Sequence, residues 1–178
     1  MTDEDQAATD WPRAILESLK ALDVAQVAYV PDAGHKQLIE MAHADKAMKA
    51  IALTSEEEGI GLAAGAWLGG QRAVVLMQSS GAGNCVNAIA SLTRACRLPL
   101  LLLVTMRGEE GEGNPWQVPM GEAVSPMFKT LGLKVPILWH PADAGNTVEN
   151  AGRLAFEQGH AVAVLIRQSL VGVKEFAE

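Results

Sequence analysis

The sequence alternates between short runs of apolar residues and longer segments in which apolar residues recur every three or four positions. Runs of the first kind are typical of buried β-strands, and segments of the second kind are typical of amphipathic helices. Strands are predicted at Val24–Val30, Lys49–Thr54, Ala73–Gln78, Leu98–Thr105, Val135–Trp139 and Ala161–Ile166. Helices are predicted at Trp11–Leu22, His35–His43, Glu56–Trp67, Asn84–Cys96, Glu122–Leu131 and Ala142–Gln158.

The order of these elements predicts the fold class. Strand and helix alternate with mostly short connections, which favours parallel strands joined by right-handed crossovers. The run Leu98–Thr105 is almost continuously apolar, as expected for a strand that is covered on both faces. We therefore expect an α/β fold that is three-layered and doubly wound, with a mostly parallel six-stranded sheet and helices on both faces.

Length, composition and charge narrow the possibilities. A chain of 178 residues can bury a substantial core; residues 1–10 are acidic and polar and are expected to be disordered, and residues 11–178 to form a single domain. The net charge of −7 argues against nucleic acid and anionic membranes as partners. The N-terminal residues do not resemble a leader peptide, and the longest apolar run is too short to span a bilayer, so we expect a cytoplasmic protein.

The two cysteines fall on one predicted helix. Cys85 and Cys96 would lie roughly 16 Å apart at about 1.5 Å per residue. A disulfide requires Cα atoms within about 7 Å, so none is expected. Because no histidine is near either residue, we predict two small buried hydrophobic side chains rather than metal ligands.

The predicted helix Glu56–Trp67 has an unusual composition. Each glycine in a helix costs about 1 kcal/mol relative to alanine. A helix face without side chains indicates that another backbone or a flat ligand lies against it. Three glycines and three alanines make up half of this helix: Gly59, Gly61, Ala63, Ala64, Gly65 and Ala66.

Three consecutive acids begin the same helix, and two interpretations of them remain open. An acid just past a strand end sits where ligands bind in open α/β sheets. Alternatively, Ser55 and Glu58 form a capping box, and Glu56 and Glu57 only favour the positive end of the helix dipole. Capping accounts for Ser55 and Glu58, but it does not account for the glycines.

Four loops should meet at one edge of the sheet, because the carboxyl ends of parallel strands all point the same way. These loops are Pro31–His35, Ser55–Glu57, Ser79–Asn84 and Arg107–Pro119. The last is longer than most connections in compact domains, and such loops are often functional.

The segment Ser79–Asn84 matches none of the common phosphate-binding or nucleophile motifs. Val86 stands where a dinucleotide fingerprint needs its third glycine, a P-loop lysine is missing, and no Gly-x-Ser-x-Gly is present. It is either a glycine turn that lets a ligand approach the backbone or a plain strand-to-helix turn.

Arginine and histidine offer weaker candidates. Arg107 could bind an anionic substrate with two parallel hydrogen bonds, or it could pair with the glutamates that follow it. His35 is interpreted as a solvated residue at a helix start rather than as a catalytic base. His43, His140 and His160 are isolated in the sequence and receive no role.

Taken together, these residues resemble the pyrimidine-binding domain of thiamine-diphosphate-dependent 2-oxo acid decarboxylases, in the branch of sulfopyruvate and phosphonopyruvate decarboxylases. The resemblance covers nearly the whole chain after residue 10. It rests on five segments in the same order: Val30–Asp32, Glu56–Gly61, Met77–Gly81, Arg107–Glu109 and Gln117–Gly121.

The resemblance implies a role for Glu56, which lies nine positions before Gly65. In the family this acid hydrogen-bonds a ring nitrogen of the cofactor's aminopyrimidine, which favours the imino tautomer that takes the thiazolium C2 proton. In the family, the helix that corresponds to the glycine-rich one packs against the same helix of a second such domain. By the same resemblance we expect cofactor contacts from Glu56, Ser80, Gly81, Gly83 and Asn84, and substrate contacts from Pro31, Asp32, His35, Arg107 and Gln117.

The sequence departs from the family in two respects. The family holds diphosphate and Mg²⁺ with a Gly-Asp-Gly motif in a separate domain, whereas this chain contains no Asp-Gly pair. The resemblance therefore implies a beta-type partner subunit that binds diphosphate and Mg²⁺, with no metal site on this chain. Ala33 and Gln117 stand where the branch often has serine and histidine.

By this resemblance the expected substrate is an anionic three-carbon 2-oxo acid, with sulfopyruvate favoured over phosphonopyruvate. Two other functions remain open at this level. The chain could be a non-catalytic scaffold or regulatory protein of the same fold. It could also be a Rossmann-type nucleotide-binding domain, which the missing third glycine disfavours.

Overall fold

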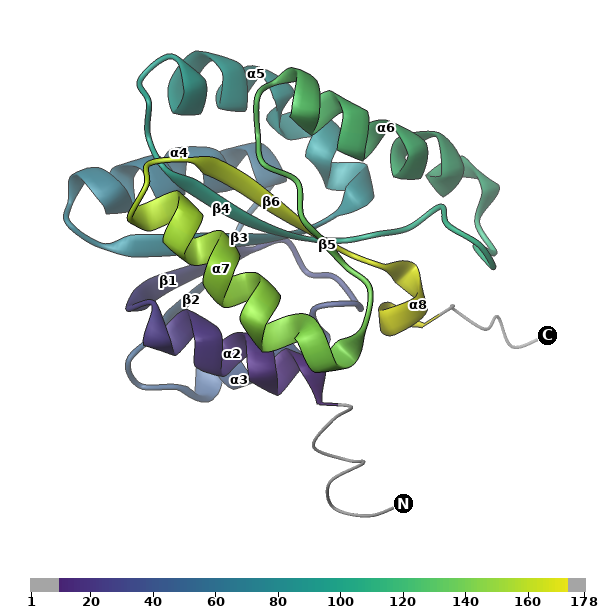
Figure 1. Ribbon diagram of the computed structural model, residues 1–178, viewed down its shortest axis with the longest axis horizontal. Helices are drawn as coiled ribbons and strands as arrows, with labels where there is room; N and C mark the ends of the chain where they lie inside the picture. The colour runs from purple at the N-terminus through teal and green to yellow at the C-terminus, as the bar shows by residue number, and fades with distance from the viewer. Residues whose placement is uncertain (1–9, 173–178) are drawn as a thin grey trace.

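The computed structural model describes residues 10–172 of the chain (Figure 1). Its centre is a parallel sheet of strands in the order β2-β1-β3-β4-β6-β5. The strands are β1 (Val24–Tyr29), β2 (Lys49–Ala52), β3 (Arg72–Gln78), β4 (Leu100–Thr105), β5 (Ile137–Leu138) and β6 (Ala161–Ile166). The predicted six-stranded α/β sheet is confirmed, and β5 is the one strand much shorter than expected.

Helices cover both faces of the sheet. On one face lie α2 (Trp11–Ala21), α3 (Lys36–Ala44) and α7 (Ala144–Phe156); on the other lie α4 (Glu56–Leu68), α5 (Val86–Ala88) and α6 (Val118–Thr130) (Figure 1). Two separate hydrophobic cores result, one on each side of the sheet. Strand β3 supplies both, because Val74 and Leu76 face one core while Val75 and Met77 face the other.

The segment after β3 differs most from prediction. The expected turn and single helix are replaced by a 3-10 helix (Ser79–Cys85), the short α5 and a π-helical segment (Ile89–Arg94). Such irregular helical turns are frequent at functional sites. Hydrophobic periodicity predicted that this segment is helical, but it could not distinguish the 3-10, α and π hydrogen-bond patterns.

Several helix boundaries also differ from the predicted ones. Residues 1–9 of the predicted disordered segment lie outside the described residues, but Asp10 caps α2 by accepting a hydrogen bond from the Arg13 backbone N–H. The helix α6 begins at Val118, because Pro119 fits its first turn, and a 3-10 turn (Pro115–Gln117) precedes it. A short helix α8 (Gln168–Val171), which was not predicted, follows β6.

The strand order locates the ligand-binding edge. The chain passes from β1 outward to β2, and then crosses back to place β3 on the other side of β1. In open α/β sheets, ligands bind outside the carboxyl ends of the strands at such a reversal. The loops after β1 and β3 border this point, so Asp32 and Gln78 are candidates for contact with a ligand.

Candidate functional site

Three polar side chains stand at neighbouring strand ends. Gln78 ends β3 and Thr105 ends β4, and the register of the sheet places these two residues side by side. Asp32 lies in the loop after β1, the strand on the other side of β3. Parallel pairing therefore brings together residues that are 27 to 73 positions apart in the sequence.

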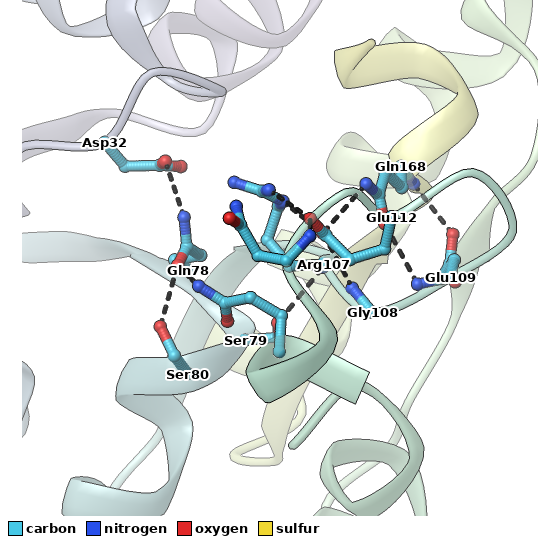
Figure 2. A network of polar contacts seen from close by, with 11 residues as sticks. Asp32, Gln78, Ser79, Ser80, Arg107, Gly108, Glu109, Glu112 and Gln168 are labelled. Carbon is cyan, nitrogen blue, oxygen red and sulfur yellow. Dashed lines mark hydrogen bonds and ion pairs between the residues drawn. The ribbon is translucent and has the colours of Figure 1, made fainter. Parts of the chain in front are cut away.

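These side chains form one hydrogen-bond network. Gln78 Nε2 donates to Asp32 Oδ1 over 3.2 Å (Figure 2). Thr105 Oγ1 donates to the other carboxylate oxygen, Asp32 Oδ2. Ser80 Oγ and Gln117 Nε2 donate to the other end of the Gln78 amide, its Oε1 atom, over 2.7 and 3.3 Å. The Gln78 amide thus links the loop after β1, the helical turn after β3 and the long loop.

A pocket of about 200 Å³ opens beside this network, between the loop after β1 and the start of α4. Asp32 and Glu56, the two acids predicted as site residues, both contribute to its wall. It is lined by Val30, Pro31, Asp32, Glu56, Gln78 and Ser80. The pocket therefore lies at the strand reversal, and it contains four of the residues proposed from the sequence.

Glu56 is the first residue of α4 and rests on the turn after β3. Its Oε2 atom accepts a hydrogen bond from Asn84 Nδ2 over 3.2 Å. A Cβ atom at position 81 would overlap the Glu56 carboxylate and lie 2.5 Å from its Cγ atom. Gly81 is thus required for the acid to occupy this position, whereas Gly83 faces only the flexible Met120 side chain at 3.3 Å.

The long loop is held by a buried ion pair. Arg107 donates through Nε and Nη2 to the two carboxylate oxygens of Glu112, over 2.7 and 2.6 Å (Figure 2). Glu112 also accepts hydrogen bonds from the backbone N–H groups of Gly108 and Asn114 and from Gln168 Nε2. The Arg107 guanidinium and these donors lower the pKa of Glu112 to about 2.

The alternative in which Arg107 pairs with a following glutamate therefore describes the structure. The Arg107 backbone N–H also donates to the buried Ser79 Oγ over 3.1 Å. Glu112 engages the Nε and Nη2 atoms of the guanidinium, and the predicted contact of Arg107 with a substrate stays a prediction.

A second acid fastens the same loop to the C-terminal part of the fold. Glu109 Oε2 accepts hydrogen bonds from Arg167 Nε and the Gln168 backbone N–H, over 2.9 and 2.8 Å. The Glu109 backbone N–H in turn donates to Gln168 Oε1. These contacts fix the loop against α8 and leave its far side, with the exposed Trp116, toward solvent.

His35 is not solvated, which corrects the interpretation from sequence. It does begin a helix, as the N-cap of α3, but its side chain is fully buried. His35 Nε2 donates to the Leu103 carbonyl over 3.1 Å, and burial lowers the pKa of the imidazole. Sequence reasoning missed this because the next residues are polar, while the tertiary fold encloses the ring under β4. His35 does not line the pocket.

The predicted capping box is also wrong in detail. Ser55 is the N-cap of α4, but its side chain makes no capping hydrogen bond. Glu58 Oε2 instead accepts a hydrogen bond from the Thr54 backbone N–H over 2.8 Å. Glu58 therefore has a local structural role, and the adjacent Glu56 remains available to the pocket.

The two cysteines have different environments. Cys85 is buried as predicted, and burial together with Glu56 and Glu57 raises the pKa of its thiol to about 12. Cys96 is exposed, which corrects the prediction for that residue. It lies beyond the end of the π-helical segment, where the helical face that packs on the sheet has already ended.

Four residues of the site received no role in the sequence analysis. Gln78 and Thr105 each end a buried strand with a polar side chain, and that position was the signal that could have identified them. No local signal distinguishes Ser79 or Glu112, because their partners are 28 and 5 residues away on other turns of the chain.

The site can offer a hydrogen-bond acceptor to a ligand. Glu56 places a carboxylate in the pocket wall, in a position that only a glycine at residue 81 allows. Within residues 10–172, no three His, Cys, Asp or Glu side chains come together as metal ligands. None of the helices among the described residues combines the length and apolar character needed to cross a bilayer.

Comparison with known proteins gives consistent matches. Residues 10–127 match the family described as thiamine pyrophosphate enzyme, N-terminal TPP binding domain. The chain is 35% identical over 157 residues to the sulfopyruvate decarboxylase subunit alpha of Methanothermobacter thermautotrophicus, covering 88% of this chain and 95% of that one. It is 34% identical over 131 residues to the phosphonopyruvate decarboxylase of Streptomyces hygroscopicus, covering 73% of this chain and 33% of the relative.

A solved structure supports the fold. The 2-oxoglutarate:ferredoxin oxidoreductase from Magnetococcus marinus aligns with a TM-score of 0.71 at 14% identity, over 90% of this chain and 29% of that one. The family match covers well over half of the chain, and the alpha subunit is matched along nearly its whole length. The chain therefore belongs to the family of thiamine pyrophosphate (thiamine diphosphate) enzymes and contains the N-terminal TPP-binding domain of that family.

Proposed function

We propose that this chain is the pyrimidine-binding subunit of a thiamine-diphosphate-dependent decarboxylase that acts on an anionic 2-oxo acid. The favoured reaction converts sulfopyruvate to sulfoacetaldehyde and CO2, and phosphonopyruvate is the second candidate. The position of Glu56 carries the proposal, because it is an acid at the pocket wall, above a glycine, in a chain of this family. The similarity to alpha subunits supports the assignment as a subunit.

Bound thiamine diphosphate supplies the carbon nucleophile and the electron sink for loss of CO2. In the proposed enzyme, this chain holds the aminopyrimidine and controls the protonation of its nitrogen atoms. Glu56 would accept a hydrogen bond at the ring nitrogen, and Asn84 fixes the Glu56 carboxylate from the other side. Ser80, Gly81 and Gly83 form the turn against which the ring would lie.

A partner subunit completes the proposed enzyme by binding diphosphate and Mg²⁺. The charged residues that line the pocket on this chain are the acids Asp32 and Glu56. An anionic substrate needs positive charge nearby, since unpaired charges are costly to remove from water. We place that positive charge on the partner subunit and the cofactor, because Arg107 does not line this pocket and two of its guanidinium nitrogen atoms bind Glu112.

Reconstitution tests the proposal. The chain alone is expected to release no CO2 from sulfopyruvate. With a Gly-Asp-Gly-containing beta-type subunit, thiamine diphosphate and Mg²⁺, it should release CO2 and form sulfoacetaldehyde. Parallel assays with phosphonopyruvate and pyruvate determine the substrate class. A complete mixture that forms stably but decarboxylates none of the three acids would overturn the proposal and favour a non-catalytic scaffold.

Gly81→Ala is expected to lower kcat of this complex by about tenfold or more while leaving the fold intact. The added methyl overlaps the carboxylate and the Cγ atom of Glu56, all side-chain atoms, so we expect Glu56 to rotate away from the pocket instead of the backbone moving. Activity and the melting temperature should be measured together. Gly145→Ala is the matched control, since its Cβ would lie 3.4 Å from Ser18 Oγ in ordinary contact. Full activity in Gly81→Ala would show that the position of Glu56 does not matter.

Self-association through α4 is the second part of the proposal. Gly61 and Gly65 lie on one exposed face of this helix, and a Cβ atom at either would meet nothing within 4 Å. The nearby Leu68 is 76% exposed. Apolar surface of this kind, next to a strip without side chains, suits close packing against a second copy of the helix.

Gly65→Leu should therefore block self-association without destabilising the single chain. The added side chain has free space in the monomer and would obstruct a helix packed closely at that point. Light scattering after size exclusion measures the mass. Asn150→Leu, on the exposed side of α7, is the control for added apolar surface. An unchanged mass in Gly65→Leu relative to an associating wild type would exclude this face as the interface.

A further inference from the structure

We propose that Gln78 is a positioning residue of the decarboxylase: its amide holds the Asp32 carboxylate toward the pocket and couples it to the long loop. The inference rests on the proposed function and adds a residue that sequence reasoning did not identify. It is carried by the geometry of the amide, whose two ends engage different parts of the site.

The chemistry of Asp32 fixes which way the Gln78 amide points. An ionised carboxylate only accepts hydrogen bonds, so the NH2 end of the amide must face Asp32. The carbonyl end then faces Ser80 and Gln117, which must both donate. One acid therefore determines the orientation of the Gln78 amide and, through it, of the Ser80 hydroxyl (Figure 2) and the Gln117 amide.

Asp32 itself has little freedom to rotate. Thr105 Oγ1 holds the carboxylate oxygen that Gln78 does not. Behind the loop, a Cβ atom at Gly34 would lie 2.8 Å from both Thr105 Cγ2 and Val171 Cγ1. The loop after β1 is thus packed closely against β4 and α8, and the two hydrogen bonds set the direction of its carboxylate.

The position of Gln78 argues for more than a structural contact at a strand end. Gln78 and Asp32 both line the pocket, so the amide and the carboxylate that it holds would lie against bound substrate. Gln117 comes from the loop that Glu112 and Glu109 fasten to the rest of the fold. Through Gln78, the placement of this loop is linked to the direction of Asp32.

Gln78→Glu in the reconstituted complex tests the inference, because it keeps the shape and the acceptor while replacing the donor by a carboxyl. Two carboxyl groups at hydrogen-bond distance share one proton, which raises the pKa at which the pair becomes fully ionised. The other titratable groups near this pair are Glu56 across the pocket, the buried His35, which interacts with Asp32, and Lys36 and Glu40 of α3, which line a second pocket together with Asp32.

The sign of the pH effect follows. At low pH the new carboxyl is protonated and donates to Asp32 as the amide does, whereas at high pH both groups are charged and repel. We expect kcat of Gln78→Glu, divided by the wild-type value at the same pH, to fall about tenfold or more as the pH rises. KM should change less than kcat. Gln78→Ala cannot donate at any pH, so its ratio should be low throughout.

Gln71→Glu is the matched control. Gln71 immediately precedes the opposite end of β3, is exposed, and pairs with Gln26. The same charge change there should give a flat ratio near one. An active wild type with a pH-independent ratio for Gln78→Glu, or full kcat in Gln78→Ala, would overturn this inference alone. An inactive wild-type complex would overturn the proposed function and this inference with it.

Discussion

Glu56→Gln is expected to lower kcat of the reconstituted decarboxylase by about a hundredfold or more, with little change in the melting temperature. The substitution keeps the size of the side chain and the acceptor for Asn84, but it removes the negative charge at the pocket wall. A neutral amide cannot favour the protonated ring nitrogen of an aminopyrimidine as a carboxylate does. The loss should therefore appear in the rate of decarboxylation and much less in the fold.

Steady-state CO2 release and isothermal calorimetry with thiamine diphosphate measure the two consequences separately. Glu17→Gln is the control, because Glu17 is 61% exposed on α2 and forms only a weak contact with Lys20. Its kcat should equal the wild-type value. A Glu56→Gln complex with wild-type kcat would show that the acid at the start of α4 is not the catalytic group.

Glu112→Gln is expected to reduce the free energy of unfolding by about 3 kcal/mol, because it leaves the buried Arg107 charge without its partner. The Glu112 side chain is 2% exposed and the Arg107 side chain 11%, so water cannot replace the lost contact easily. The amide would also turn its NH2 group toward at least one of the donors that now surround the carboxylate. Urea unfolding at pH 7 measures the change.

The pH dependence gives this second prediction a distinctive signature. The folded-state pKa of Glu112 is about 2, against 4.5 for the free group. A carboxyl with a lowered pKa stabilises the fold above its unfolded pKa, and that stability is lost as the pH falls through the folded value. The stability gap between wild type and Glu112→Gln should thus be full above about pH 5 and shrink toward pH 2.

Glu110→Gln is the control for this loop, since Glu110 is exposed two residues before Glu112. It should unfold like wild type at every pH. A Glu112→Gln protein whose stability matched wild type at pH 7 would show that the ion pair contributes nothing to the fold.

The alternation of apolar runs determined much of this protein before any coordinates. It was sufficient for the six parallel strands and the helices on both faces, because burial on both sides demands continuous runs such as Leu100–Thr105. It was also sufficient to predict that four loops meet at one edge of the sheet, since the carboxyl ends of parallel strands all lie at the same edge. Glu56, Asp32 and Ser80 could be proposed as site residues on that basis together with the family resemblance, and the structure places all three in one pocket.

The tertiary structure alone decided which polar groups pair with which. The register of β3 and β4 sets Gln78 beside Thr105, and both reach an aspartate far away in the sequence. Burial of His35 and the Arg107–Glu112 pair depend on how loops fold back over the sheet. Local periodicity describes which face of an element is apolar, whereas the direction of a polar side chain in a loop depends on partners that only packing brings within hydrogen-bond distance.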